Sequence, residues 1–139
     1  MNDTLPVSAE QLVSTPVVAV NAEHSFAAAW EAMRQRQVHD LVVLDDDYGI
    51  AAVLDDRTLA AGWPGGGPEA PHRSQVGELV QHGVRCVGPG ELAAAVARVM
   101  TESRCDAVPV VSRNGMVLGL VTATDLVAAV AREAVVVAP

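Results

Sequence analysis

An internal repeat constrains this chain more than any other feature. Shifting the sequence by 66 positions places similar residues on one another without a gap over roughly forty residues. The run Phe26-Ala27-Ala28-Ala29 then falls on Leu92-Ala93-Ala94-Ala95. The run His39-Asp40-Leu41-Val42 falls on Cys105-Asp106-Ala107-Val108, and Gly49 falls on Gly115. In a chain of 139 residues, such a duplication predicts two half-size units with one common fold.

Each copy is expected to run strand, helix, strand, strand, helix. A short apolar segment, Pro16–Val20 or Gly83–Val87, reads as the first strand. Apolar residues at helical spacing follow at Phe26–Met33 and at Leu92–Met100. The remaining strands and the closing helix are expected at Leu41–Leu44, Ile50–Leu54 and Arg57–Ala61 in the first copy, and at Val108–Val111, Met116–Val121 and Thr124–Ala134 in the second. The fold class is therefore mixed α/β (α+β), built from two β-α-β-β-α repeats.

The two copies are joined by a segment that cannot continue a helix. Residues 62–71 contain four of the chain's glycines and three of its prolines, which is typical of a surface linker. We therefore predict a first repeat at 1–62, a Gly/Pro-rich linker at 63–75 and a second repeat at 76–139. Short helices at Ala9–Ser14 and Val76–His82 are expected to lead into the two copies.

The charge and the distribution of apolar residues argue against nucleic acid and membranes as binding partners. The formal net charge is −8, and no basic stripe is present, which argues against nucleic-acid binding. No basic start followed by an apolar run suggests a signal peptide, and no apolar run reaches the ~20 residues of a bilayer span. The sequence predicts a cytoplasmic protein that does not insert into a membrane. Two cysteines, Cys86 and Cys105, are too few for a disulfide framework and suit a core.

Catalytic and metal-binding patterns are not found. No Ser–His–Asp arrangement, phosphate loop or paired carboxylate site can be assembled, so we predict no enzyme activity. The four histidines lack the spacing of metal ligands. An acidic patch, Asp45–Asp47 with Asp55 and Asp56, could hold a divalent cation, but a solvated hairpin tip also explains it. No metal and no required cofactor are predicted.

The tandem pattern resembles a pair of CBS domains, often called a Bateman module. In the second copy the resemblance lies in the run from Asp106 to Val111, in Asn114-Gly115 and in the closing segment Gly119–Leu126 with its Thr-x-x-Asp-Leu signature. In the first copy it lies in Ser14–Val18, the Ala27–Met33 helix and the His39–Leu44 strand. The resemblance extends from roughly Leu12 to Arg132.

The resemblance implies two repeats packed sheet to sheet about a pseudo-twofold axis. Two clefts would lie between them, where adenosine-containing ligands such as AMP, ADP, ATP or S-adenosylmethionine are held in the family. Such modules commonly pair into a homodimer, and an effector protein, unknown here, would read the ligand's effect.

One cleft has a plausible set of ligand-binding residues. An Asp just inside a helix start, Asp125, can accept two hydrogen bonds from a ribose diol, while Thr122 and Thr124 can meet a phosphate near the helix N-terminus. Thr122 or Thr124 could equally be the N-cap, with Asp125 serving only the cap. By the resemblance, the first copy would supply the residues that line the base: Thr15, Val20, His39 and Asp40.

The second cleft is expected to be empty or weak. If Leu59 is aligned with Leu126, a one-residue gap relative to the 66-residue shift, then Thr58 stands where the ribose Asp should be. The gapless alignment puts Leu59 there instead. Asp55 and Asp56 would repel a phosphate, although Arg57 could offset them. We therefore expect one nucleotide per chain.

Two functional hypotheses follow from these residues. In the first, the module senses an adenine nucleotide or related adenosyl ligand, and binding shifts the packing of the copies or of a dimer. In the second, the module dimerises or docks on another protein without any ligand. Thr122 and Asp125 favour the first hypothesis, and the altered motif of the first copy favours the second.

Overall fold

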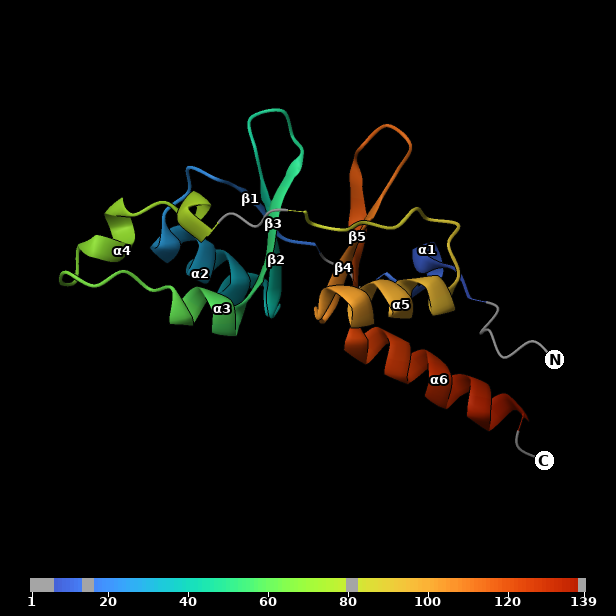
Figure 1. Ribbon diagram of the computed structural model, residues 1–139. Coiled ribbons are helices and arrows are strands. Elements are labelled where there is room, and N and C mark those ends of the chain that lie inside the picture. Colours follow the sequence, from blue (N-terminus) through green and yellow to red (C-terminus); the bar gives the residue numbers. More distant parts are fainter. Residues whose placement is uncertain (1–6, 14–16, 80–82, 138–139) are drawn as a thin grey trace. The chain divides into compact units, whose positions relative to one another are not determined.

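The computed structural model describes residues 7–13, 17–79 and 83–137 and contains two compact units (Figure 1). One unit is formed by the described residues of 16–84, and the other by those of 1–15 together with 85–139. The helices are α1 (Ala9–Leu12), α2 (Phe26–Arg36), α3 (Asp56–Ala61), α4 (Ala70–Arg73), the 3-10 helix η1 (Val76–Leu79), α5 (Ala93–Ser103) and α6 (Ala123–Val137). The strands are β1 (Ala19–Asn21), β2 (Asp40–Leu44), β3 (Ile50–Asp55), β4 (Ala107–Val111) and β5 (Val117–Thr122).

The first-repeat unit is built on a three-stranded sheet of order β1-β2-β3. β1 pairs with β2 in parallel, and β2 pairs with β3 antiparallel. Helices α2, α3 and α4 lie on the same side of these strands in Figure 1. The core is formed by alternate strand residues, by one face of α2 and by single residues of α3, of η1 and of the segment before β1. It comprises Val18, Val20, Phe26, Ala29, Met33, Leu41, Val43, Ala52, Leu54, Leu59 and Val76.

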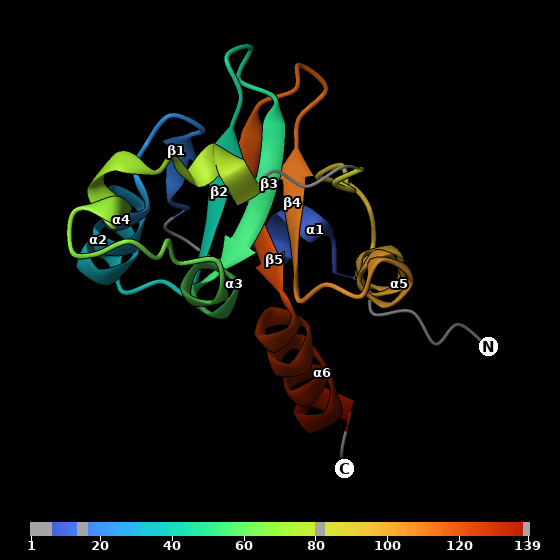
Figure 2. The same cartoon turned by 60° about the vertical axis from the view of Figure 1, so that its left-hand side comes forward.

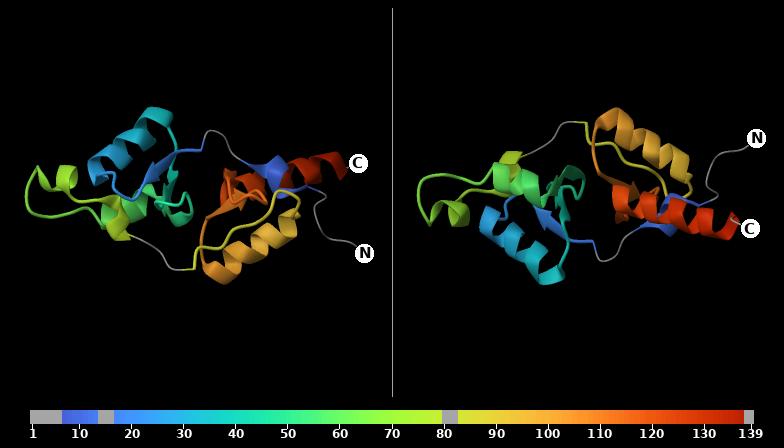
Figure 3. Two further views of the ribbon diagram at one scale, coloured as in Figure 1. Left: turned by 90° about the horizontal axis from the view of Figure 1, so that it is seen from above. Right: turned by 90° about the horizontal axis from the view of Figure 1, so that it is seen from below.

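The second-repeat unit is built on the antiparallel hairpin of β4 and β5. The predicted first strand, Gly83–Val87, is reduced to a single parallel bridge between Val87 and Val110. Gly88, Pro89 and Gly90 directly follow Val87, which leaves little chain on that side that can extend a ladder. Helix α6 leads away from the end of β5 (Figure 2), and it lies beside α5 (Figure 3).

The two repeats match with a shift of 67 residues, so the predicted shift of 66 is wrong. β2 begins at Asp40 and β4 at Ala107, 67 positions later. The same interval separates Phe26 from Ala93 at the helix starts, and the β-bulge after Val43 from the one after Val110. No gap is needed anywhere. Leu92 therefore corresponds to Ser25, the N-cap of α2, and it lies half-exposed before α5 rather than on its buried face.

Both hairpins close with the same turn. In the second repeat the Ser112 N–H donates to the Met116 carbonyl and the Gly115 N–H to the Ser112 carbonyl. Only Gly115 has a positive φ, at 84°, so the Asn-Gly pair does not form a two-residue turn with both residues left-handed. The loop is longer than a two-residue turn, and it contains one left-handed residue, Gly115, shortly before β5 begins.

Each short leading helix packs in the unit that holds the other repeat. Ala9 and Leu12 of α1 belong to the core cluster of α5, β4, β5 and α6. Val76 of η1 belongs to the core of the first repeat, where its N–H donates to the His24 carbonyl at 2.8 Å. The segment Ala9–Ser14 was expected to lead into the first copy, but its helix packs against the second repeat instead. α1 ends at Leu12, and Ser14 and residues 80–82 lie outside the described residues.

The predicted linker is partly ordered by an aromatic contact. Gly62 ends α3, as its sequence position suggested, and α4 forms one turn farther along. The Trp63 ring meets Phe26 and Trp30 of α2 edge to face, with ring centroids 6.0 and 5.8 Å apart. Trp63 thus anchors the segment after α3 against the first repeat.

Candidate functional site

The start of α6 carries the residue pair that the sequence singled out. One carboxylate oxygen of Asp125, Oδ2, accepts the Thr122 N–H at 2.7 Å and the Thr122 hydroxyl at 2.9 Å. In return, the Asp125 N–H donates to Thr122 Oγ1 at 3.3 Å. This reciprocal arrangement is a capping box, with Thr122 at the N-cap and Asp125 three residues later. It decides between the two predicted N-caps in favour of Thr122.

The N–H groups at this helix start are largely used within the protein. The Thr122 and Asp125 N–H groups serve the capping box, and the Ala123 N–H donates to the Asp106 carbonyl at 2.8 Å. The Thr122 hydroxyl also donates to Asp125. A carboxylate has roughly four acceptor positions, and Thr122 takes two of those on Asp125. Thr124 lies exposed in the first turn.

The start of α3 is the counterpart of this site in the first repeat. Asp55 is the N-cap, and its Oδ1 accepts the Thr58 N–H at 2.6 Å. With the 67-residue shift, Asp55 occupies the place of Thr122 and Thr58 the place of Asp125. The carboxylate and the hydroxyl have therefore exchanged positions, and the first repeat has no acid where the second has Asp125.

An ion pair lies beside this first-repeat helix start. His39, just before β2, approaches the Asp56 carboxylate with Nδ1 at 3.0 Å from Oδ2. The hydrogen bond and the negative charge of Asp56 raise the pKa of His39 above its ordinary value. Partial burial pushes the pKa of Asp55 upward, but the Thr58 hydrogen bonds and the Arg57 charge outweigh it and leave that pKa lowered. Arg57 Nη2 lies 3.8 Å from Asp55 Oδ2.

The residues predicted to line the base belong to the first-repeat unit, apart from Thr15, which lies outside the described residues. Val20 is buried in β1 opposite Val43, and its side chain is part of the core cluster. Asp40 begins β2 opposite Asp55 and is half-buried. Thr122, Thr124 and Asp125 belong to the second-repeat unit. Each set is described within its own unit, and a cleft shared by both remains a prediction.

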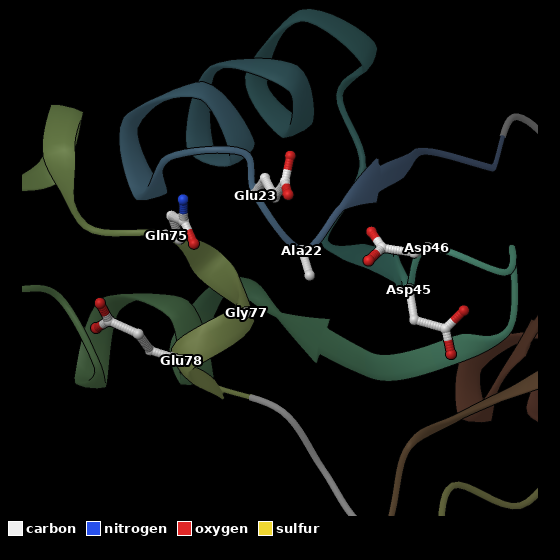
Figure 4. Close-up of a pocket in the computed structure, with 7 residues that line it drawn as sticks. All are labelled: Ala22, Glu23, Asp45, Asp46, Gln75, Gly77 and Glu78. Carbon is white, nitrogen blue, oxygen red and sulfur yellow. The ribbon is translucent and has the colours of Figure 1, made fainter.

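An acidic hollow that the sequence did not predict lies at the ends of β1 and β2. It has a volume of about 400 Å³ and is lined by Ala22, Glu23, Asp45, Asp46, Gln75, Gly77 and Glu78 (Figure 4). The Ala22 N–H donates to the Leu44 carbonyl, which brings the two strand ends together. Because the carboxylates come from three distant segments, no local motif marks them. The acidic patch proposed from the sequence is thus divided, since Asp55 and Asp56 lie at the opposite end of β3.

A second hollow includes two of the residues described above. It has a volume of about 230 Å³ and is lined by Trp30, Met33, Arg34, Gln37, Val38, His39 and Asp56. Its lining therefore combines apolar side chains with charged groups of both signs.

Metal and cysteine chemistry receive no support from these geometries. Within residues 7–13, 17–79 and 83–137, no three His, Cys, Asp or Glu side chains are grouped so that they could hold a metal ion. Cys105 packs against the core of its unit, but Cys86 is exposed, so the prediction that both suit the core is wrong for Cys86. Partial desolvation still raises the pKa of both thiols, which lowers the thiolate fraction that redox chemistry needs. Among the described helices, none is long and apolar enough to cross a bilayer.

The two repeats seen in the structure coincide with two segments that match the model of a known protein family. The model of the CBS domain matches this chain twice, over residues 9–62 and 76–132. The chain belongs to the CBS-domain family. The second match begins 67 residues after the first, in agreement with the structural register. Both matched segments start at a leading helix, Ala9 in α1 and Val76 in η1.

Relatives of this CBS protein share its length and its fold. Hypoxic response protein 1 of Mycobacterium tuberculosis is 26% identical over 129 residues, which cover 93% of this chain and 89% of that protein. A crystal structure of Hypoxic Response Protein I with two coordinated zinc ions is also 26% identical, with a TM-score of 0.71, and covers 88% of this chain and 98% of that one.

Two further CBS structures contain adenosine compounds. The CBS domain pair of MJ0100, in complex with 5′-methylthioadenosine and S-adenosylmethionine, has a TM-score of 0.76 at 18% identity and covers 91% of this chain and 98% of that one. CBSX2 in complex with AMP has a TM-score of 0.72 at 20% identity, with the same coverage. At these identities the likeness to both structures supports the fold. CBS-domain proteins are in general regulatory modules rather than enzymes.

Proposed function

We propose that this CBS protein is a regulatory module that binds one adenosine-containing ligand per chain and passes the effect to a partner. The observation that carries the proposal is the Thr122–Asp125 pair at the start of α6, where a carboxylate is held in one orientation by two hydrogen bonds. A fixed carboxylate can accept from both hydroxyls of a ribose at little cost in side-chain entropy. The two CBS neighbours that contain adenosine compounds support this ligand class.

The other predicted residues receive the following roles in this proposal. His39 and Asp40 stand at the start of β2, near the base, and Thr124 offers an exposed hydroxyl. Since the Val20 side chain is buried in the core, β1 would contribute the main chain of Val20 rather than its isopropyl group. Thr15 is proposed from the resemblance alone. The first-repeat cleft, where Thr58 replaces the acid, is proposed to stay empty.

A second function is favoured by a different observation. Val127 and Val130 lie exposed on α6, and the carboxylate of Asp125 already serves the helix cap. These features suit a module that dimerises or docks on a protein without a ligand. We keep this as the alternative, together with the family-based proposals of a homodimer, an effector protein and a cytoplasmic location.

Calorimetric titration with adenosine compounds separates these two functions. Asp125→Glu is the informative variant, because Glu at this position preserves a capping box while its carboxylate is displaced by one methylene. If Asp125 binds a ribose, binding should weaken at least about tenfold while the helix cap survives. Thr58→Ala is the matched control, since it changes the same helix position in the first repeat and should leave affinity unchanged.

The outcomes of this titration differ clearly. Saturable binding near one ligand per chain that is weakened by Asp125→Glu and not by Thr58→Ala supports the sensor. A folded protein that binds none of the tested adenosine compounds contradicts the sensor and favours the interaction module.

A further inference from the structure

The hollow of about 230 Å³ beside the end of α2 combines an exposed aromatic side chain with a positive charge. It is lined by residues of α2, of the segment before β2 and of the start of α3, all within the first-repeat unit. We propose that this hollow binds a small aromatic carboxylic acid in its ionised form. Such a site would be additional to the adenosyl site proposed above and would not depend on it.

The apolar part of the lining suits an aromatic ring. Trp30 is still 36% exposed although its indole packs edge to face against Trp63, so part of a large aromatic surface stays open to solvent. Met33 is buried and Val38 half-buried in the same lining. An indole and a thioether both make favourable contacts with a further aromatic ring. Since the hollow is smaller than the roughly 300–1,000 Å³ of pockets for drug-sized ligands, we expect a molecule with one ring and a short substituent.

The charged part of the lining suits a single negative charge. Within residues 7–13, 17–79 and 83–137, the side chain of Arg34 has no hydrogen-bond or ion-pair partner. The other two charged residues of the lining are paired with each other, His39 Nδ1 with Asp56 Oδ2 at 3.0 Å. When His39 is protonated this pair is neutral, and the Arg34 guanidinium is left as the unbalanced charge. A guanidinium can hold a carboxylate through two parallel hydrogen bonds.

The second repeat lacks these groups at the corresponding places. With the 67-residue shift, Ala97 stands in the place of Trp30. Thr101 stands in the place of Arg34. The same helix is therefore built without an indole or a guanidinium at these positions, so the repeat fold does not by itself require them.

Tryptophan fluorescence measures occupancy of the hollow, because Trp30 lines it. The chain has only two tryptophans, so Trp63→Phe leaves Trp30 as the single one and keeps an aromatic ring at position 63. At pH 6, below the raised pKa of His39, this variant should bind phenylacetate with a Kd of about 1 mM or tighter. Phenylacetamide has nearly the same shape without the charge and should bind at least about threefold more weakly. Calorimetry of the unaltered protein with phenylacetate checks the result without the substitution.

Arg34→Gln tests the source of the preference for a carboxylate. Gln is a good helix former, as Arg is, so α2 is kept while the guanidinium is removed. Phenylacetate affinity should fall at least about threefold, to that of phenylacetamide, whose own affinity should not change. Arg36→Gln is the matched control, because it removes the same charge from the same helix turn but outside the lining. It should lower phenylacetate affinity by less than about twofold.

Four results would overturn this inference. The first is that phenylacetate does not bind or binds no better than phenylacetamide, and the second is that Arg34→Gln weakens it no more than Arg36→Gln. The third is tighter binding of a peptide that ends in Phe, which would assign the hollow to a protein C-terminus. The fourth is Trp30 fluorescence that changes with protein concentration and not with phenylacetate, which would indicate a second copy of the chain over the hollow.

Failure of this inference and failure of the proposed function look different. No adenosine compound is present in these titrations, so none of the four results bears on the adenosyl site. A protein that binds phenylacetate in the expected way but no adenosine compound would keep this site and lose the proposed function.

Discussion

Tyr48 and Gly115 occupy the same place in the two hairpins and share a left-handed backbone, with φ of 63° and 84°. Each is followed by the residue whose carbonyl closes the turn, Gly49 or Met116. A tyrosine in this conformation is strained, because its Cβ crowds the backbone, whereas glycine is not. The first hairpin therefore stores strain that the second avoids.

Replacing Tyr48 with Gly should raise the free energy of unfolding by about 0.5–1 kcal/mol, since relief of strain exceeds the entropy cost of glycine. The Tyr48 side chain is 78% exposed, so little packing is lost. Gly115→Ala should lower the same free energy by about 1 kcal/mol. Urea denaturation measures both. Shifts of the same sign in the two variants would contradict a shared left-handed requirement.

Gly119 in β5 should not tolerate even a methyl group. A Cβ added there would clash with Val13 Cγ1, which follows α1. Gly119→Ala should therefore cost about 1–3 kcal/mol of unfolding free energy, and adding Val13→Ala to it should recover most of that loss. Ala52→Gly, at the corresponding place in β3, is the control and should cost only about 1 kcal/mol. No rescue by Val13→Ala would refute the contact.

Loss of the Thr122 hydroxyl should weaken the start of α6. Thr122→Val keeps the shape of the side chain but removes the two hydrogen bonds that the hydroxyl makes with Asp125, at a cost of about 0.5–2 kcal/mol, and leaves the bond from the backbone N–H of residue 122 in place. Thr122→Ser retains the hydroxyl and should remain within about 0.5 kcal/mol of the original protein. Thermal unfolding of the two variants is the measurement, and equal stability would argue against the cap.

The His39–Asp56 pair should make stability depend on pH. Because folding raises the pKa of His39 above 6.5, the pair's contribution is complete below that pH and is lost as pH rises through the folded pKa. An NMR titration of the His39 ring should give a pKa above 6.5 that falls in Asp56→Asn. A His39 pKa that is the same in both proteins would contradict the ion pair.

The order of elements in each repeat was predictable because it rests on local periodicity. Buried strands such as Leu41–Leu44 and helical faces such as that of Phe26, Ala29 and Met33 are visible as patterns of apolar residues. The register was misjudged by one residue, because a shift of 66 places several identical residues on one another: Ala27–Ala29 on Ala93–Ala95, Asp40 on Asp106 and Gly49 on Gly115. The left-handed conformation belongs to the place in the turn, and in the first repeat a tyrosine fills that place.

The candidate site was predictable only where its residues lie close together in the sequence. The Thr-x-x-Asp spacing is enough to place Thr122 and Asp125 on one helix turn, and the structure joins them. The acidic hollow depends on Glu23, Asp45 and Glu78, which only the folded sheet brings together. Nor could the sequence separate a cap from a ligand site, because one carboxylate has acceptor positions for both roles.

The crossed packing of α1 and η1 bears on how a single repeat would behave. Each repeat completes its core with the leading turn of the other, as Ala9 and Val76 show. A lone repeat would therefore keep an unfilled core position and carry an unused leading turn. Two identical lone copies could each complete the other by exchanging these turns, which is the geometry of a domain-swapped dimer. Gene duplication would then have joined in one chain a partnership that the single repeat already required.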